Sequence, residues 1–143
     1  MPDPHDKHMT KAGARQPFGR SIAVLPLGAT EQHGPHLPFE TDAIIAQGVC
    51  ERAAALLPGT MDVEFLPVER VGYSPEHLGF PGSLSLGWSE AVERWIGIGR
   101  SLAERGVGKL VMLNAHGGNS PLMTIVATEL RVRLGMLAVA TSW

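Results

Sequence analysis

Cysteine and concentrated charge are scarce in this sequence. Cys50 is the single cysteine among 143 residues, which excludes an intrachain disulfide framework and fits a reducing compartment. The formal net charge is -2 and no basic run occurs, so nothing points to nucleic acid or an acidic membrane surface as a partner. No apolar run approaches the roughly 20 residues that cross a bilayer, and residues 1–20 lack the apolar segment of a signal peptide. We therefore expect a cytoplasmic protein with no membrane segment.

The bulk composition is that of one globular domain. Hydrophobic residues make up 44% of the chain and charged residues 18%, a balance typical of folded rather than disordered proteins. Residues 1–20 carry Pro, Gly, His and charge without periodicity, so we predict a flexible N-terminal arm there. We interpret His5 and His8 as solvated residues of this arm. Residues 21–143 then form a single folded domain.

Apolar runs and helical periodicities alternate along residues 21–143. Strands are predicted at residues 21–27, 63–68, 109–113 and 136–140, and helices at residues 41–57, 89–105 and 120–134. Strands that alternate with helices of this length predict right-handed crossovers and a mostly parallel sheet. The expected fold class is therefore α/β, a layered α/β/α domain.

The predicted helices carry capping residues and apolar rows. Their expected N-caps are Thr41 or Asp42, Ser89 and Ser120. Gly106 is expected as the left-handed residue that ends the second helix, and Gly135 is expected to stop the third. Cys50 is interpreted as a small buried residue of the first helix. The side chains expected to face the core are Ile44, Ile45, Val49, Ala53 and Leu56 in the first helix, Val92, Trp95, Ile96, Ile98 and Leu102 in the second, and Leu122, Ile125, Val126, Leu130 and Leu134 in the third.

Two polar clusters follow the ends of predicted strands. Residues 31–42 come after the strand at 21–27, and residues 114–119 come after the strand at 109–113. Ligands of parallel α/β sheets bind beyond the carboxyl ends of the strands, so both clusters should open on the same edge. Residues 72–82 form a long turn-rich loop, which is usually a functional feature. The sequence therefore predicts an active site at this edge of the sheet.

The two clusters contain carboxylates and imidazoles that suit a divalent metal. The candidate ligands are Glu31, His33, Asp42 and His116. Zn and Mn suit this mixture of oxygen and nitrogen, and a bridging Asp42 would let the set contribute to a pair of ions. A metal-bound hydroxide could then attack a carbonyl carbon, with the metal stabilising the oxyanion. For His36 a ligand role and a bracing role in the turn are equally open, and Glu40 is interpreted as a solvated charge.

The glycines after His116 leave another interpretation open. Gly117 and Gly118 let the backbone approach a ligand closely, and the N-terminus of the following helix favours an anion. A phosphate-binding α/β domain is thus conceivable, although the sequence has no Walker ending and no GxGxxG. A tight strand-to-helix turn would explain the same glycines. A serine hydrolase is disfavoured because no GxSxG elbow is present.

On these residues the sequence resembles the creatininase family of metal-dependent creatinine amidohydrolases and their relatives. The segments that carry the resemblance are residues 25–38 (LPLGATEQHGPHLP), Thr41 and Asp42, Glu76 and His77 with residues 80–83 (FPGS), and residues 114–119 (NAHGGN). The resemblance extends from about residue 21 to residue 143. It implies a creatininase-like α/β domain, often assembled as a homo-oligomer such as a hexamer, that opens cyclic amides or cleaves related C–N bonds.

The resemblance also implies a role for each candidate ligand. Glu31, Asp42 and His116 would bind one ion of a two-metal centre, and His33 and Asp42 would bind the other, with Zn or Mn as the metal. Creatininase proper carries a carboxylate two positions after its later histidine, where this chain has Gly118. The glycine form is similar to relatives such as formamide hydrolases and a peptidase of mycofactocin maturation.

We predict a metal-dependent hydrolase that acts on a non-peptide C–N amide bond of the cyclic amide or formamide type. The residues expected to contact this small-molecule amide substrate are His77, Gly117, Gly118 and Asn119. Family members are generally longer, so we expect residues 21–143 to correspond to the N-terminal part of their domain. The alternative is a non-catalytic metal-binding or assembly module.

Overall fold

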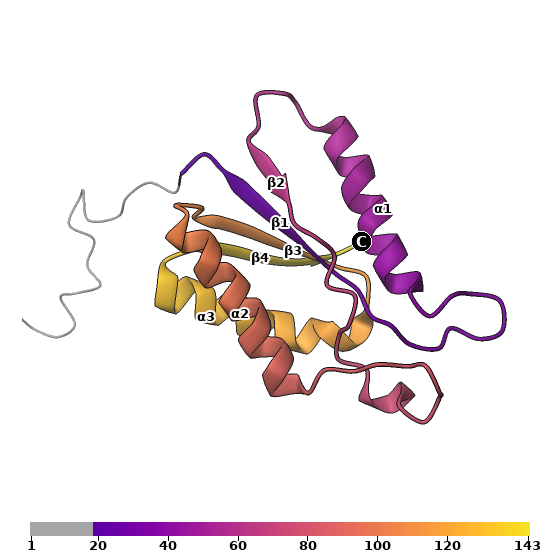
Figure 1. Ribbon diagram of the computed structural model, residues 1–143. Helices are drawn as coiled ribbons and strands as arrows, with labels where there is room; N and C mark the ends of the chain where they lie inside the picture. Colours follow the sequence, from indigo (N-terminus) through magenta and orange to yellow (C-terminus); the bar gives the residue numbers. More distant parts are fainter. Residues whose placement is uncertain (1–18) are drawn as a thin grey trace, which may run out of the picture.

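A four-stranded parallel sheet organises the protein (Figure 1). The computed structural model describes residues 19–143, so nearly all of the predicted arm at residues 1–20 lies outside the described residues. The strands are β1 (Ile22–Leu27), β2 (Val63–Phe65), β3 (Lys109–Asn114) and β4 (Leu137–Ser142), in the spatial order β2-β1-β3-β4. The helices are α1 (Thr41–Leu56), α2 (Trp88–Glu104) and α3 (Ser120–Leu134), with the 3-10 helices η2 (Pro75–His77) and η3 (Gly117–Asn119).

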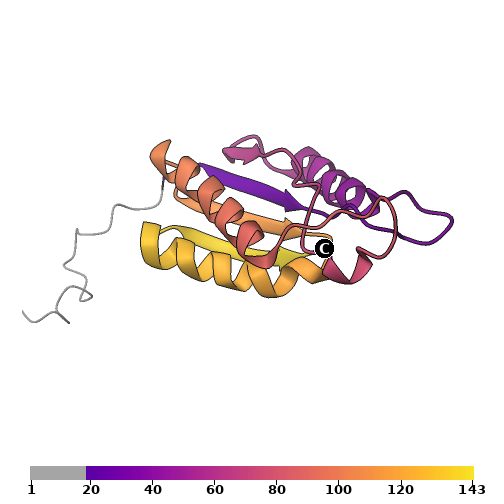
Figure 2. The ribbon, with the colours of Figure 1, turned by 60° about the horizontal axis from the view of Figure 1, so that its bottom comes forward.

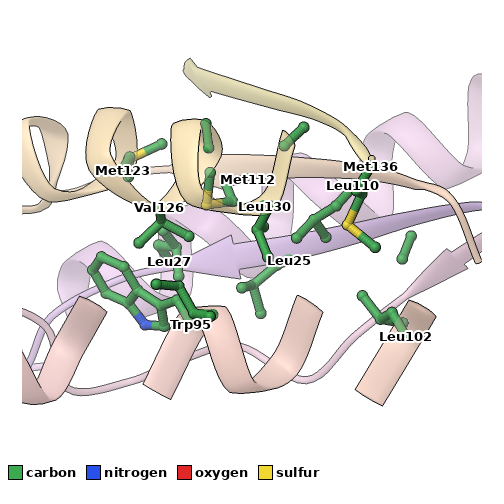
Figure 3. Packing of buried hydrophobic residues seen from close by; sticks show 14 of the residues in the cluster. Leu25, Leu27, Trp95, Leu102, Leu110, Met112, Met123, Val126, Leu130 and Met136 are labelled. Atoms are coloured by element: carbon green, nitrogen blue, oxygen red, sulfur yellow. The ribbon is translucent and has the colours of Figure 1, made fainter. Parts of the chain in front are cut away.

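The helices cover the two faces of the sheet unequally. Figures 1 and 2 show α2 and α3 side by side on one face and α1 on the other. The main core lies between β1, β3 and the α2–α3 pair, where Leu25 and Leu27 meet Trp95, Val126 and Leu130 (Figure 3). The predicted layered α/β fold with a parallel sheet is confirmed. Among the described helices, none has the length and apolar character to cross a bilayer.

The predicted core-facing row of α1 is only partly right, because Ile45, Val49 and Ala53 are half-buried and none of the five predicted residues is fully buried. The buried residues of this helix are Asp42, Ala43, Ala46 and Cys50, while Ile44 is 54% exposed and Leu56 69% exposed. The helix lies so close to the end of β1 that a Cβ placed on Gly28 would come 2.6 Å from the Ala43 Cα atom. Only small side chains fit such a contact, so Ile44 and Leu56 lie on the outer surface of the helix while Ile45 and Val49 are half-buried.

Several predicted boundaries and caps also differ from the structure. No side chain caps α1, whose N-cap is Glu40, and α2 begins at Trp88 behind Gly87 rather than behind Ser89. The N-cap of α3 is Asn119 instead of Ser120. The second strand ends at Phe65, two residues before Pro67, which cannot donate to a ladder. Ile125 of α3 is exposed.

The predicted glycine ends of the helices are confirmed. Gly106 has a φ of 84° and Gly135 a φ of 61°, both in the left-handed region that glycine adopts without steric cost. Of the side chains predicted to face the core, Trp95, Ile96 and Leu102 of α2 are buried. Leu122, Val126 and Leu130 of α3 are buried as well. These two helices therefore follow their apolar periodicity, whereas α1 does not.

Candidate metal centre

The two predicted polar clusters meet beyond the carboxyl ends of neighbouring strands. β1 and β3 pair in parallel with Leu27 opposite Asn114, and the Ala115 amide extends the ladder by donating to the Leu27 carbonyl at 2.9 Å. The loop at residues 28–40 and the turn at residues 115–119 therefore leave the sheet side by side. This register brings residues far apart in sequence to one edge.

Three of the four predicted ligands form a compact buried group. Glu31, Asp42 and His116 each offer one ligand atom, and these atoms all lie within 4.8 Å of one another. The Nδ1 atom of His116 is 3.0 Å from Asp42 Oδ2 and 3.3 Å from Glu31 Oε1. All three residues are buried. Their atoms are thus close enough to share one ion.

His33 joins this group through the other oxygen of Asp42. Its Nε2 atom lies 3.0 Å from Asp42 Oδ1 and 3.9 Å from Glu31 Oε1. Its Nδ1 atom is 2.9 Å from the Glu31 carbonyl oxygen, which can only accept, so Nδ1 carries the proton and Nε2 faces the carboxylates. Asp42 therefore presents one oxygen to each of two imidazoles.

The imidazole of His116 carries its proton on the other ring nitrogen, Nε2, and turns Nδ1 toward the carboxylates. Its Nε2 atom donates to the Tyr73 carbonyl at 2.9 Å and lies 3.1 Å from the Ser74 hydroxyl. Because Nε2 holds a proton, Nδ1 is the atom available to a metal. Burial opposes the imidazolium form, but the hydrogen bonds that the ring donates to Asp42 and to the Tyr73 carbonyl, together with the nearby carboxylate charges, outweigh burial and raise the pKa of His116.

Glu31 leaves one carboxylate oxygen without a hydrogen bond. Oε2 is buried and has no partner within hydrogen-bond geometry, although His77 Nε2 lies 3.5 Å away. A buried carboxylate oxygen without a partner is costly. A divalent cation among these residues would satisfy this oxygen and offset two buried negative charges, so the donor set fits a metal such as Zn or Mn.

His77 comes from η2 in the long loop between β2 and α2. The Gln32 amide donates to its Nδ1 atom at 3.3 Å, which directs Nε2 toward Glu31. The ring of Phe80 packs near it, with centroids 6.4 Å apart. His77 is only partly buried, so it lies at the solvent-facing side of the group. The predicted functional loop thus reaches the site.

The remaining candidate residues from the sequence make no hydrogen bond or ion pair with the carboxylates of the buried ligand group. His36 and Glu40 are exposed on the loop at residues 28–40. Gly117 is exposed with open space around it, whereas a Cβ on Gly118 would come 2.3 Å from the Tyr73 carbonyl oxygen and 2.5 Å from His116 Nε2. Gly118 therefore makes room for the protein's own groups. The side chain of Asn119 is fully buried and hydrogen-bonded within the chain.

Sequence reasoning missed the residues that orient the candidate ligands. The Tyr73 carbonyl and the Ser74 hydroxyl hold His116, and Asn114 Oδ1 accepts from the His116 amide at 3.0 Å. Backbone carbonyls have no signature in a sequence. Ser74 lay within a loop that was predicted to be functional, but its type alone gave no indication of a contact with His116.

A comparison with known proteins decides the family. Residues 7–143 match the sequence model of creatininase, described as creatinine amidohydrolase. The chain belongs to the creatininase family. It is 38% identical over 114 residues to the mycofactocin precursor peptide peptidase of Mycolicibacterium smegmatis, covering 77% of this chain and 45% of the peptidase. It is 32% identical over 112 residues to the creatinine amidohydrolase of Pseudomonas putida, covering 75% of this chain and 42% of that enzyme.

Solved creatininases share the fold. A structure described as creatininase Mn superimposes with a TM-score of 0.74 at 30% identity, covering 87% of this chain and 51% of the other. A mutant creatininase of Zn-Zn type gives a TM-score of 0.69 at 30% identity, covering 86% of this chain and 50% of the other. The chain spans about half the length of the creatininase relatives that it matches.

Proposed function

We propose that this chain carries the metal centre of an amidohydrolase that cleaves a C–N amide bond. The observation that supports the proposal most strongly is Asp42, a buried carboxylate with one oxygen 3.0 Å from His33 and the other 3.0 Å from His116. An arrangement of this kind suits a carboxylate that bridges two ions. We infer that Glu31, Asp42 and His116 hold one ion and that His33 and Asp42 hold the second, each being Zn or Mn.

The chain's own residues would prepare this site for hydrolysis. When bound, the metal would supply a water activated near neutral pH and a Lewis acid for the amide carbonyl. Tyr73 and Ser74 hold His116 with Nδ1 toward the carboxylates. His77, the most exposed member of the group, is placed to contact a substrate or to transfer a proton at Nε2. Gly117 is exposed within the turn at residues 115–119 and would leave space for the substrate.

The proposed substrate is a small non-peptide amide of the cyclic amide or formamide class. The Pseudomonas relative is named for creatinine, whereas the mycobacterial relative is named for a peptide. A peptide is therefore the competing class. The alternative function is a metal-binding or assembly module without turnover, which is favoured by the glycine at position 118 in place of a carboxylate.

A turnover assay tests this proposal. Purified protein loaded with Zn²⁺ or Mn²⁺ would be incubated with a cyclic amide, an N-formyl amine and a short peptide. We expect hydrolysis of one of the first two, loss of the activity on chelation, and recovery on return of metal. Hydrolysis of the peptide alone would reject the non-peptide substrate class. Metal binding without turnover of any of the three would favour the non-catalytic module.

A further inference from the structure

Asn119 connects three loops at the edge of the sheet. It is 0% exposed, and its Oδ1 atom accepts from the Tyr73 amide at 3.0 Å. Its Nδ2 group donates to the Gly28 carbonyl at 3.0 Å and to Asn114 Oδ1 at 3.2 Å. Every hydrogen-bonding atom of the side chain therefore has a partner within the protein, which leaves none for a substrate.

The hydrogen bond from Tyr73 links Asn119 to His116. The amide of Tyr73 donates to Asn119, and the carbonyl of the same residue accepts from His116 Nε2 at 2.9 Å. Tyr73 is thus held by hydrogen bonds at both its amide and its carbonyl. The position of that carbonyl determines which imidazole nitrogen keeps the proton, and hence that Nδ1 faces Asp42 and Glu31.

The hydrogen bond to Gly28 links Asn119 to the loop and helix that carry the other candidate ligands. Gly28 begins the loop that carries Glu31 and His33, and its backbone lies against Ala43, the residue next to Asp42. The hydrogen bond from Asn119 Nδ2 fixes the Gly28 carbonyl. The space around the side chain is tight, because a Cβ on Gly72 would lie 2.5 Å from Asn119 Oδ1. Small displacements of Asn119 are therefore transmitted to both neighbouring loops.

We propose that Asn119 is a positioning residue of the metal centre, which sets the orientation of His116 through Tyr73 and the placement of the Glu31 loop through Gly28. This role rests on the proposed function, because the oriented groups are the proposed metal ligands. Asn119 itself contacts none of the four ligand side chains in the hydrogen-bond network. Residues that orient metal ligands typically contribute about 10- to 100-fold in metal affinity.

Zinc affinity separates positioning from a general structural role. Asn119→Ala should raise the Zn²⁺ dissociation constant by about 10- to 100-fold. Met123→Ala is the matched control, because Met123 is a buried core residue of α3, the helix whose N-cap is Asn119, and makes no hydrogen bond to the site. We expect this control to lose stability while its Zn²⁺ affinity changes less than about twofold. Equal losses of affinity in the two variants would overturn the proposal.

Asn119→Asp provides a second test with a near-isosteric side chain. It keeps the acceptor for Tyr73 and loses the donor to both Gly28 and Asn114. An added negative charge near the site would by itself strengthen cation binding. A weaker Zn²⁺ affinity in Asn119→Asp is therefore opposite to the effect of the charge, and we attribute it to lost positioning of the ligands. An unchanged or higher affinity would contradict the role of the Gly28 contact, including in the case where Asn119→Ala does not fold.

A nuclear magnetic resonance measurement on the metal-free protein completes the experiment. The His116 Nε2 proton, donated to Tyr73, should give a resolved resonance in the native protein and in Asn119→Asp, and should exchange with solvent and broaden in Asn119→Ala. Persistence of the resonance in Asn119→Ala would overturn the proposed path through Tyr73. Because this readout needs no metal, it decides the role of Asn119 separately from the proposed function, which fails if the native protein binds no Zn²⁺.

Discussion

At the scale of single residues, Asp42 lies at a helix start but contacts two histidines instead of capping the helix. Its place at the start of a helix led to the prediction of a cap, but its carboxylate faces His33 and His116 instead. The N-terminus of α1 still favours its negative charge through the helix dipole. A helix start thus supplies a buried carboxylate beside two imidazoles, which is a donor set that suits a divalent cation.

Gly118 offers a sharp test at this scale. In Gly118→Ala the new methyl group would lie 2.3 Å from the Tyr73 carbonyl oxygen and 2.5 Å from His116 Nε2, so one of them must move. We expect a loss of about 1–3 kcal/mol in the free energy of unfolding and a Zn²⁺ affinity lowered by about 10-fold or more. Chemical denaturation and calorimetric titration measure the two effects.

Gly117→Ala is the matched control for this prediction. Gly117 is the adjacent residue, its Cβ position is open, and its φ lies outside the left-handed region. Both stability and Zn²⁺ affinity should stay close to those of the native protein. A Gly118→Ala variant that also behaves like the native protein would show that His116 does not depend on this close contact.

The candidate ligands could be predicted from the sequence, whereas the residues that orient them could not. Glu31 and His116 each follow an apolar run that ends at a glycine or an asparagine, and the parallel register then brings them to one edge. The hydrogen bond from His116 to Tyr73 involves a backbone carbonyl 43 residues away. The fit of Gly118 against that carbonyl depends on the path of a loop, which residue types do not specify.

At the scale of elements, α1 differs from α2 and α3 in how it packs. The latter two bury regular apolar rows against the sheet and each other, so their periodicity predicted their orientation. α1 contacts the sheet through alanines, Cys50 and Asp42. A helix that packs through small residues at close range carries a weak apolar pattern, and this is why its buried face was misassigned.

The close approach of α1 to β1 gives a prediction for this element. In Gly28→Ala the added methyl group would lie 2.6 Å from the Ala43 Cα atom and 2.8 Å from its nitrogen. Because both are backbone atoms, the helix must move, and Asp42 must move with it. We expect Zn²⁺ affinity to fall by about 10-fold, as measured by calorimetric titration.

Gly48→Ala serves as the control for α1. Gly48 is exposed in the middle of the helix, and nothing lies within 4 Å of its Cβ position. Replacing a helical glycine by alanine should raise the free energy of unfolding by about 0.5–1 kcal/mol and leave Zn²⁺ affinity unchanged. A Gly28→Ala variant with native Zn²⁺ affinity would show that the site tolerates movement of α1.

At the scale of the whole molecule, one face of the sheet is incompletely covered. Within residues 19–143, α1 is the only α-helix on its face of the sheet, and large apolar side chains are exposed on several elements. They include Ile44 and Leu56 of α1, Leu137 and Val139 of β4, Trp143, and Val132 of α3 on the opposite face. Exposed apolar side chains that gather on one face of a protein are a typical feature of protein–protein contacts.

We expect some of these exposed apolar side chains to support a homo-oligomer, with a hexamer as the form that the family resemblance implies. Light scattering of the purified protein should then give a multiple of the 15.3 kDa chain mass. Leu56→Lys and Val132→Lys, at two exposed apolar positions, would identify which helix takes part by lowering the measured mass. A native protein of 15.3 kDa at micromolar concentration would contradict the expectation.

Metal content tests the central claim most directly. The native protein, loaded with Zn²⁺ or Mn²⁺ and freed of excess ion, would be measured by inductively coupled plasma mass spectrometry beside Asp42→Ala and His116→Ala. The controls are Glu40→Gln and His36→Gln, which change exposed groups of the loop at residues 28–40. We predict retained metal in the native protein and both controls, and little or none in the two site variants. Full metal occupancy in Asp42→Ala and His116→Ala would contradict the assignment of the site.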